Sequence, residues 1–139
     1  MMTNLLANII FVLHIIFILF ILIIPFIKTR ALVLILHIST CITLLIHWVM
    51  NSDICGLTVL ESYLRGIEMK ETFINRIISP IYTIDNKSIW IITIILLITS
   101  INKLLKNDEF ILTLKNFKNI ENYDIKNILN ALKPLIKRK

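Results

Sequence analysis

Most side chains able to do chemistry in this sequence lie in one short stretch that follows an apolar run. Eight of them fall within nineteen positions: His47, Trp48, Asn51, Asp53, Cys55, Thr58, Glu61 and Arg65. Two further histidines, His14 and His37, lie inside the apolar runs that precede this stretch. Imidazole, thiolate and carboxylate groups can bind metals or transfer protons, so these ten residues form the candidate polar cluster.

Turn and cap chemistry explains much of this stretch without a ligand. Asn51 and Asp53 are short polar residues that compete for backbone hydrogen bonds and so end a helix. Thr58 and Glu61 have the spacing of a capping box, which predicts a helix that begins at Thr58 and leaves Glu61 partly exposed. The alternative is that Glu61 faces inward and meets His47 or Arg65 as a poorly solvated charged group.

The histidines allow two interpretations. His37 and Cys41 are four residues apart and share a helix face, so they offer half of a metal or haem site. The other candidate pair is His14 with His47, which should differ by only about 5 Å in depth within a membrane. Hydrogen bonding between helices is an equally sufficient reason for a histidine in a membrane. The sequence predicts no cofactor and favours a non-enzymatic protein, with a metal- or haem-binding redox enzyme or subunit as the alternative.

The elements that must position these residues are membrane-spanning helices. Of the 139 residues, 57% are hydrophobic and only 17% are charged, which is too apolar for a soluble domain. About twenty apolar residues suffice to cross a hydrocarbon core of about 30 Å. Spans are predicted at about 5–27, 31–50 and 88–105, the first two as a hairpin around a tight turn and the third shorter.

The remaining segments complete an all-α integral membrane fold. Residues 57–81 have apolar positions at helical spacing, which predicts an amphipathic segment along the membrane surface. Residues 106–139 should form a soluble basic tail with a short amphipathic helix that Asp124 caps. We therefore predict a membrane domain at 1–105 and a C-terminal tail at 106–139. Trp48 and Trp90 should lie on the same side of the membrane, as an aromatic belt would place them.

The distribution of positive charge predicts the orientation of the spans. The turn at 28–30 and residues 103–139 together carry eleven Lys and Arg, whereas residues 51–87 carry four. Because cytoplasmic loops are enriched in Lys and Arg, the tail should be cytosolic and residues 51–87 lumenal or exterior.

The motif in the polar stretch resembles that of known membrane proteins. His47-Trp48, Asn51, Cys55-x-Leu57-Thr58, Glu61 and Leu64-Arg65-Gly66 follow an apolar hairpin with a histidine in each helix. This pattern resembles small multi-pass membrane proteins of unknown function from large double-stranded DNA viruses. It is more loosely similar to a bacterial membrane family of unknown function with a Cys-Pro-Leu-Thr-x-x-Glu motif, although Gly56 stands here in place of the proline. The resemblance covers residues 10–82 and implies a viral membrane component without a known activity.

The sequence thus predicts a small multi-pass membrane protein with a structural or interaction role, in a host or virion membrane if viral. The expected partners are the lipid bilayer and either other membrane helices or further copies of the chain, and no nucleic acid. An oligomeric transporter or channel subunit is a further alternative. Three spans without intramembrane acidic residues offer little ion pathway unless several copies assemble.

Overall fold

The computed structural model describes residues 2–67, 85–120 and 124–136, and within these ranges the regular elements are all helices. In chain order they are α1 (Met2–Ile23), α2 (Ala31–Met50), α3 (Gly56–Arg65), α5 (Asn86–Leu105), α6 (Asp108–Lys118) and α7 (Ile125–Ile136). The predicted all-α class is confirmed. The predicted amphipathic segment at 57–81 is described only as far as residue 67, and its remainder lies outside the described residues.

Three of these helices are long and apolar enough to cross a membrane: Asn4–Ile23 within α1, all of α2 and all of α5. The first helix ends at Ile23, four residues before the predicted end of the span. Pro25 explains this end, because a proline disfavours helical backbone in the residue before it and has no N–H to continue the helix. The third span is no shorter than the second, since both contain 20 residues.

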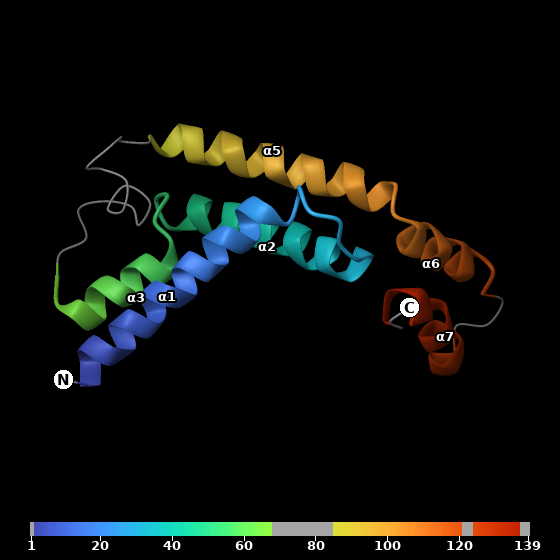
Figure 1. Cartoon of the computed structure of the whole chain (residues 1–139), viewed down its shortest axis with the longest axis horizontal. Coiled ribbons are helices and arrows are strands. Elements are labelled where there is room, and N and C mark those ends of the chain that lie inside the picture. The colour runs from blue at the N-terminus through green and yellow to red at the C-terminus, as the bar shows by residue number, and fades with distance from the viewer. Residues whose placement is uncertain (1, 68–84, 121–123, 137–139) are drawn as a thin grey trace.

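Helices α2 and α5 run antiparallel and form the centre of the molecule (Figure 1). Their shared core consists of buried residues from both helices with one from α1: Ile21, Cys41, Leu44, Trp48 and Leu96. The rings of Trp48 and Trp90 lie 5.6 Å apart between centroids, so the two tryptophans are at the same end of the spans as predicted.

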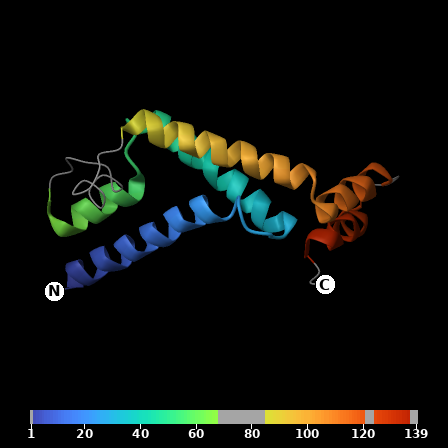
Figure 2. The same ribbon diagram turned by 45° about the horizontal axis from the view of Figure 1, so that its top comes forward.

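Helix α1 reverses into α2 through residues 24–30, but the two helices then diverge (Figure 2). The main neighbour of α1 is α3, which runs antiparallel to it. A bond of 3.0 Å from Arg65 Nη2 to Asn8 Oδ1 joins the end of α3 to the beginning of α1. The first two spans therefore make a splayed hairpin, and α3 packs on the arm that leans away.

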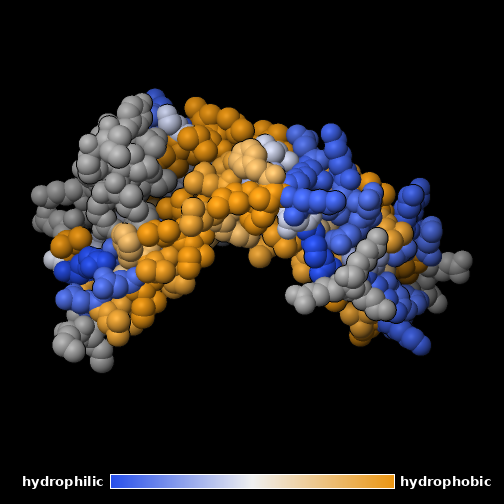
Figure 3. Space-filling view, in the orientation of Figure 1, coloured by the Kyte–Doolittle hydropathy of each residue, from blue (hydrophilic) through white to orange (hydrophobic). Residues whose placement is uncertain are grey.

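Helices α6 and α7 pack together at the opposite end, where α2 begins and α5 ends. Ala31, Leu34, Leu104 and Leu135 form a second buried cluster there. Asn107 caps α6 by accepting from the N–H groups of Glu109 and Phe110, and the Asp124 carboxylate accepts from the Ile125 N–H at 2.7 Å. Figure 3 shows an arched molecule with an apolar middle and a largely hydrophilic surface over α6 and α7.

Candidate functional site

His37 lies where the three spans meet and is completely buried. Its Nε2 is 2.9 Å from the Ile21 carbonyl of α1, and its Nδ1 is 3.0 Å from the Ser100 hydroxyl of α5. In a continuous helix the Ile21 carbonyl would accept from the N–H of residue 25, but Pro25 has none. We assign the Nε2–H tautomer, which donates to Ile21 while Nδ1 accepts from Ser100. His37 thus joins all three spans and supplies the donor that Pro25 lacks.

Cys41 shares the buried face of His37, as the spacing predicted. Its Sγ lies 3.7 and 3.8 Å from the two ring nitrogens, and the Phe20 ring packs on the imidazole with 5.6 Å between centroids. Within the described ranges, no group of three or more His, Cys, Asp and Glu side chains is placed to hold a metal ion. A metal site at this pair would need further ligands beyond those that the described residues place there.

A second buried polar group lies between α1 and α3. The Glu61 side chain is 1% exposed and its Oε1 accepts from Arg65 Nε at 2.8 Å. Arg65 is 29% exposed and also donates to Asn8, so one guanidinium links the carboxylate of α3 to an amide of α1. Of the two predicted arrangements of Glu61, the inward one with Arg65 as the partner is confirmed.

The predicted capping box at Thr58 is wrong. Helix α3 begins at Gly56 with Cys55 as its N-cap, and the Thr58 N–H already donates to the Cys55 carbonyl at 2.9 Å. The Thr58 side chain is 2% exposed, and its hydroxyl oxygen has no hydrogen-bond partner among the described residues. Packing against α1 has turned both motif residues inward, which a pattern of local cap contacts does not foresee.

His14 is also buried, at 3% exposure, on the middle of α1. From Asn8 to His14 the helix advances about 9 Å at 1.5 Å per residue, and six residues back from Arg65 cover the same length of α3. The antiparallel pairing therefore sets His14 level with the buried turn of α3 that contains Thr58, Glu61 and Ser62. Proximity of His14 to His47 stays a prediction.

The outer face of α3 is apolar. Val59, Leu60 and Tyr63 are exposed, whereas Thr58, Glu61 and Ser62 are buried. This is the reverse of a helix that lies between a core and water, which buries its apolar stripe. The described part of the amphipathic segment therefore has the predicted helical character, but its polar residues face α1.

Side-chain hydrogen bonds hold the turn between α2 and α3 to α2 on one side and to α5 on the other. His47 Nε2 accepts from the Gly56 N–H at 2.9 Å and lies 3.4 Å from Asn51 Nδ2. Asp53 Oδ1 accepts from the Trp90 indole N–H at 2.8 Å, which ties the turn to α5. A Cβ at position 56 would lie only 3.3 Å from His47 Nε2, and a proline there would lack the donating N–H. Glycine at position 56 therefore suits the close approach of this histidine.

His37 with its partners and the buried Glu61 with Arg65 both lie in the part of the chain that matches a known family. The model of the family described as Protein of Unknown function (DUF2784) matches residues 4–104. The chain belongs to this family. No curated protein and no solved structure matches the chain. The DUF2784 region runs from α1 to α5, so it contains His37, the α1–α3 pairing and the turn at 51–55, while α6 and α7 lie outside it. The resemblance to viral membrane proteins stays a prediction.

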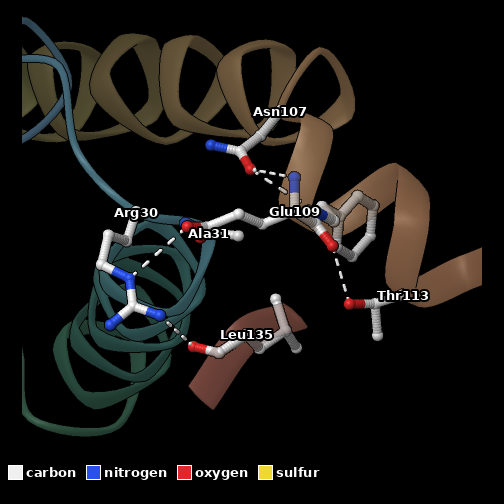
Figure 4. Close-up of polar contacts among 7 residues, drawn as sticks. Arg30, Ala31, Asn107, Glu109, Thr113 and Leu135 are labelled. Carbon is white, nitrogen blue, oxygen red and sulfur yellow. Dashed lines mark hydrogen bonds and ion pairs between the residues drawn. The ribbon is translucent and has the colours of Figure 1, made fainter. Parts of the chain in front are cut away.

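A junction that sequence reasoning missed joins the DUF2784 region to α6 and α7 (Figure 4). The Glu109 carboxylate accepts from the Ala31 N–H at 3.1 Å and lies 3.5 Å from Arg30 Nε. Arg30 Nη2 donates to the Leu135 carbonyl at 2.8 Å. Glu109 therefore caps α2 from 78 residues away, and Arg30 connects the same turn to α7. The one available signal was the absence of a capping side chain before Ala31, since Arg30 cannot accept a hydrogen bond.

Lys103 adds a further link to this junction. Its Nζ donates to the carbonyls of Pro25 and Ile27, which the end of α1 leaves without helical partners. At the end of the spans predicted to be rich in positive charge, Arg30 thus donates to a backbone carbonyl of the tail, and Lys103 donates to backbone carbonyls of the turn.

Proposed function

We propose that this protein is a non-enzymatic, multi-pass membrane component whose spans associate with other membrane helices. The observation that carries the proposal is the outer face of α2, which exposes Ser39 and Thr43 one helical turn apart between large apolar residues. Small and hydroxylated residues at this spacing let two membrane helices approach closely and share hydrogen bonds. This face is opposite to the one that His37 holds against α1 and α5.

The use of the intramembrane histidine supports a structural role. Both ring nitrogens of His37 make bonds within the chain, one to a backbone carbonyl and one to a hydroxyl. A histidine engaged in this way stabilises the packing of the spans. The motif that resembles viral membrane proteins favours a location in a virion or virus-modified membrane.

The surplus of Lys and Arg at 28–30 and in the tail supports a cytosolic position for α6 and α7. Two single-cysteine variants test this, Lys118→Cys on α6 and Asn86→Cys at the start of α5, each with Cys41 and Cys55 replaced by alanine. An impermeant maleimide added outside intact cells should label position 86 only. Labelling of position 118 instead would reverse the proposed orientation.

The association itself is tested with a photoreactive residue at Leu36, which is exposed on the same face of α2. In the native membrane it should crosslink to a protein, either a second copy or a different membrane protein. Changing both Ser39 and Thr43 to leucine should reduce this product at least several-fold, because the bulkier side chains hold the helices apart. Thr99→Leu on α5 is the matched control and should leave the product unchanged. Crosslinks to lipid alone, together with a monomer in detergent, would contradict the proposal.

A further inference from the structure

Helix α7 has more apolar circumference than its packing covers. Ala131 and Leu135 are buried against the rest of the molecule. Ile125, Leu129 and Ile136 are 74%, 55% and 61% exposed, and their spacing of four and seven residues puts them on one stripe of the helix. This exposed stripe directly borders the buried one, since Leu132 lies between the two and is partly buried.

Two exposed lysines line the other border of the stripe. Lys126 and Lys133 are seven residues apart and lie, at 100° per residue, within about one quarter turn of Leu129. Lysine side chains beside an apolar stripe can place their stems along lipid and their ammonium groups among headgroups. The order around the helix is therefore a packed face, an open apolar stripe and a basic edge.

The position of α7 sets this helix next to the ends of the spans. Leu135 packs with Ala31 and Leu104, and the Leu135 carbonyl accepts from Arg30, so α7 is fixed against the first turn of α2. Lys28, Lys103 and Lys106 lie at the same end of the spans. A bilayer that surrounds α2 and α5 would have its headgroup region at this level. The sequence of residues 103–139, which begins in the last turn of α5, contains nine Lys and Arg against four acids.

We propose that α7 docks on the surface of an anionic phospholipid bilayer, with Ile125, Leu129 and Ile136 entering the interface and Lys126 and Lys133 bonding to lipid phosphates. Two observations identify a bilayer surface as the partner of the stripe. The lysines complement anionic headgroups, and α7 is covalently connected to the spans, which already hold it at a membrane. Each lysine near an anionic leaflet contributes about a fivefold factor to binding, and this contribution weakens with salt.

The experiment uses the full chain with Cys41 and Cys55 replaced by alanine and a spin label at Leu129→Cys. The protein is placed in nanodiscs of phosphatidylcholine alone or with one third phosphatidylserine. With phosphatidylserine the label should collide preferentially with oxygen, which dissolves in lipid, and little with a water-soluble nickel chelate. A label at Asn130→Cys, about 100° around the helix from Leu129, is the control and should stay accessible to nickel in both discs.

Charge-reversal variants distinguish a specific role of Lys126 and Lys133 from an effect of the overall positive charge. Lys126→Glu with Lys133→Glu should expose the Leu129 label to water. Its accessibility to the nickel chelate should rise roughly tenfold or more, given about fivefold per lysine. Lys115→Glu with Lys118→Glu changes the net charge equally but alters exposed residues of a different helix, α6, so its effect should be much smaller.

Three results would overturn the proposal. The first is a Leu129 label that stays accessible to nickel in phosphatidylserine discs. The second is shielding that appears equally in both discs and survives the Lys126 and Lys133 reversals, since anionic lipid would then play no part. The third is shielding that depends on protein concentration in detergent, which would make a second copy of the chain the occupant.

Discussion

His37 and Glu61 are both buried polar residues, but their hydrogen-bonding groups are satisfied by different kinds of partner. His37 is neutral in the assigned tautomer, is completely buried, and bonds to both neighbouring spans. Glu61 is an acidic residue with 1% exposure, and Arg65, which is partly open to solvent, is its bonded cation. The comparison indicates that the α2–α5 centre is held by neutral hydrogen bonds, whereas α3 meets α1 through a charge pair within α3 whose guanidinium bonds to Asn8.

The largest expected effect on stability comes from removing Arg65, the more exposed partner of the charge pair. Arg65→Ala should lower the free energy of unfolding by roughly 3 to 5 kcal/mol, because it removes the bonded cation of a buried carboxylate. Glu61→Gln should cost less, since the Arg65 side chain can turn toward solvent or headgroups. Denaturation of the purified protein in mixed micelles, followed by circular dichroism, measures both losses.

Replacing the pair together is the control for that prediction. Glu61→Leu with Arg65→Leu leaves no buried charge, so it should cost far less than Arg65→Ala alone. If the double variant lost as much stability as Arg65→Ala, the pair would act through packing and the contrast with His37 would disappear.

The next largest effect on stability is expected from replacing His37, the neutral group. His37→Phe should cost about 2 kcal/mol, because the Ile21 carbonyl and the Ser100 hydroxyl both lose their partner in a water-free site. Ser100→Ala removes only one of these bonds and should cost about half as much. Tryptophan fluorescence should respond to His37→Phe, since Trp48 and Trp90 lie in the adjoining core. An unchanged stability and spectrum would mean that the histidine is not needed to join the spans.

A smaller effect is expected at the turn that connects the two regions. Asp53 has φ of 67°, in the left-handed region, and accepts from the Trp90 indole. Asp53→Ala should cost about 1 to 2 kcal/mol, because alanine loses the bond and tolerates this backbone less well. Asp53→Asn keeps the acceptor and the backbone preference and should be nearly neutral. Equal losses for the two variants in the same denaturation assay would contradict this assignment.

The smallest effect is a pH dependence at the exposed start of α5. The Ser88 hydroxyl donates to the Asp85 carboxylate and holds the pKa of Asp85 below its ordinary value. A lowered pKa in the folded state stabilises the protein above about pH 4 and loses this contribution as the pH falls through the lowered pKa. The thermal midpoint of Ser88→Ala should therefore be slightly lower than that of the wild type at pH 6 and should converge with it near pH 2. A difference that persisted at pH 2 would have another origin.

Much of the fold could be predicted from the sequence because lipid is a demanding solvent. Long uncharged runs can be stable only as spanning helices, so α1, α2 and α5 were expected close to their observed bounds. The shared level of Trp48 and Trp90 and the common face of His37 and Cys41 followed from residue spacing. The ends were less predictable, and Pro25 moved the end of α1 to Ile23.

The sequence by itself determined which helices form and which residues share a face, and the tertiary structure decided what each face meets. The pattern of α3 suits a helix on a membrane surface as well as one that turns Glu61 toward α1, because helical period is the same in both. Only the antiparallel pairing of α1 with α3 selected the second. In the same way Ser100 and Glu109 look ordinary in sequence, since the groups they bond to, His37 and Ala31, lie 63 and 78 residues away. Contacts over such distances depend on how the spans rotate and lean, and short-range patterns do not contain that information.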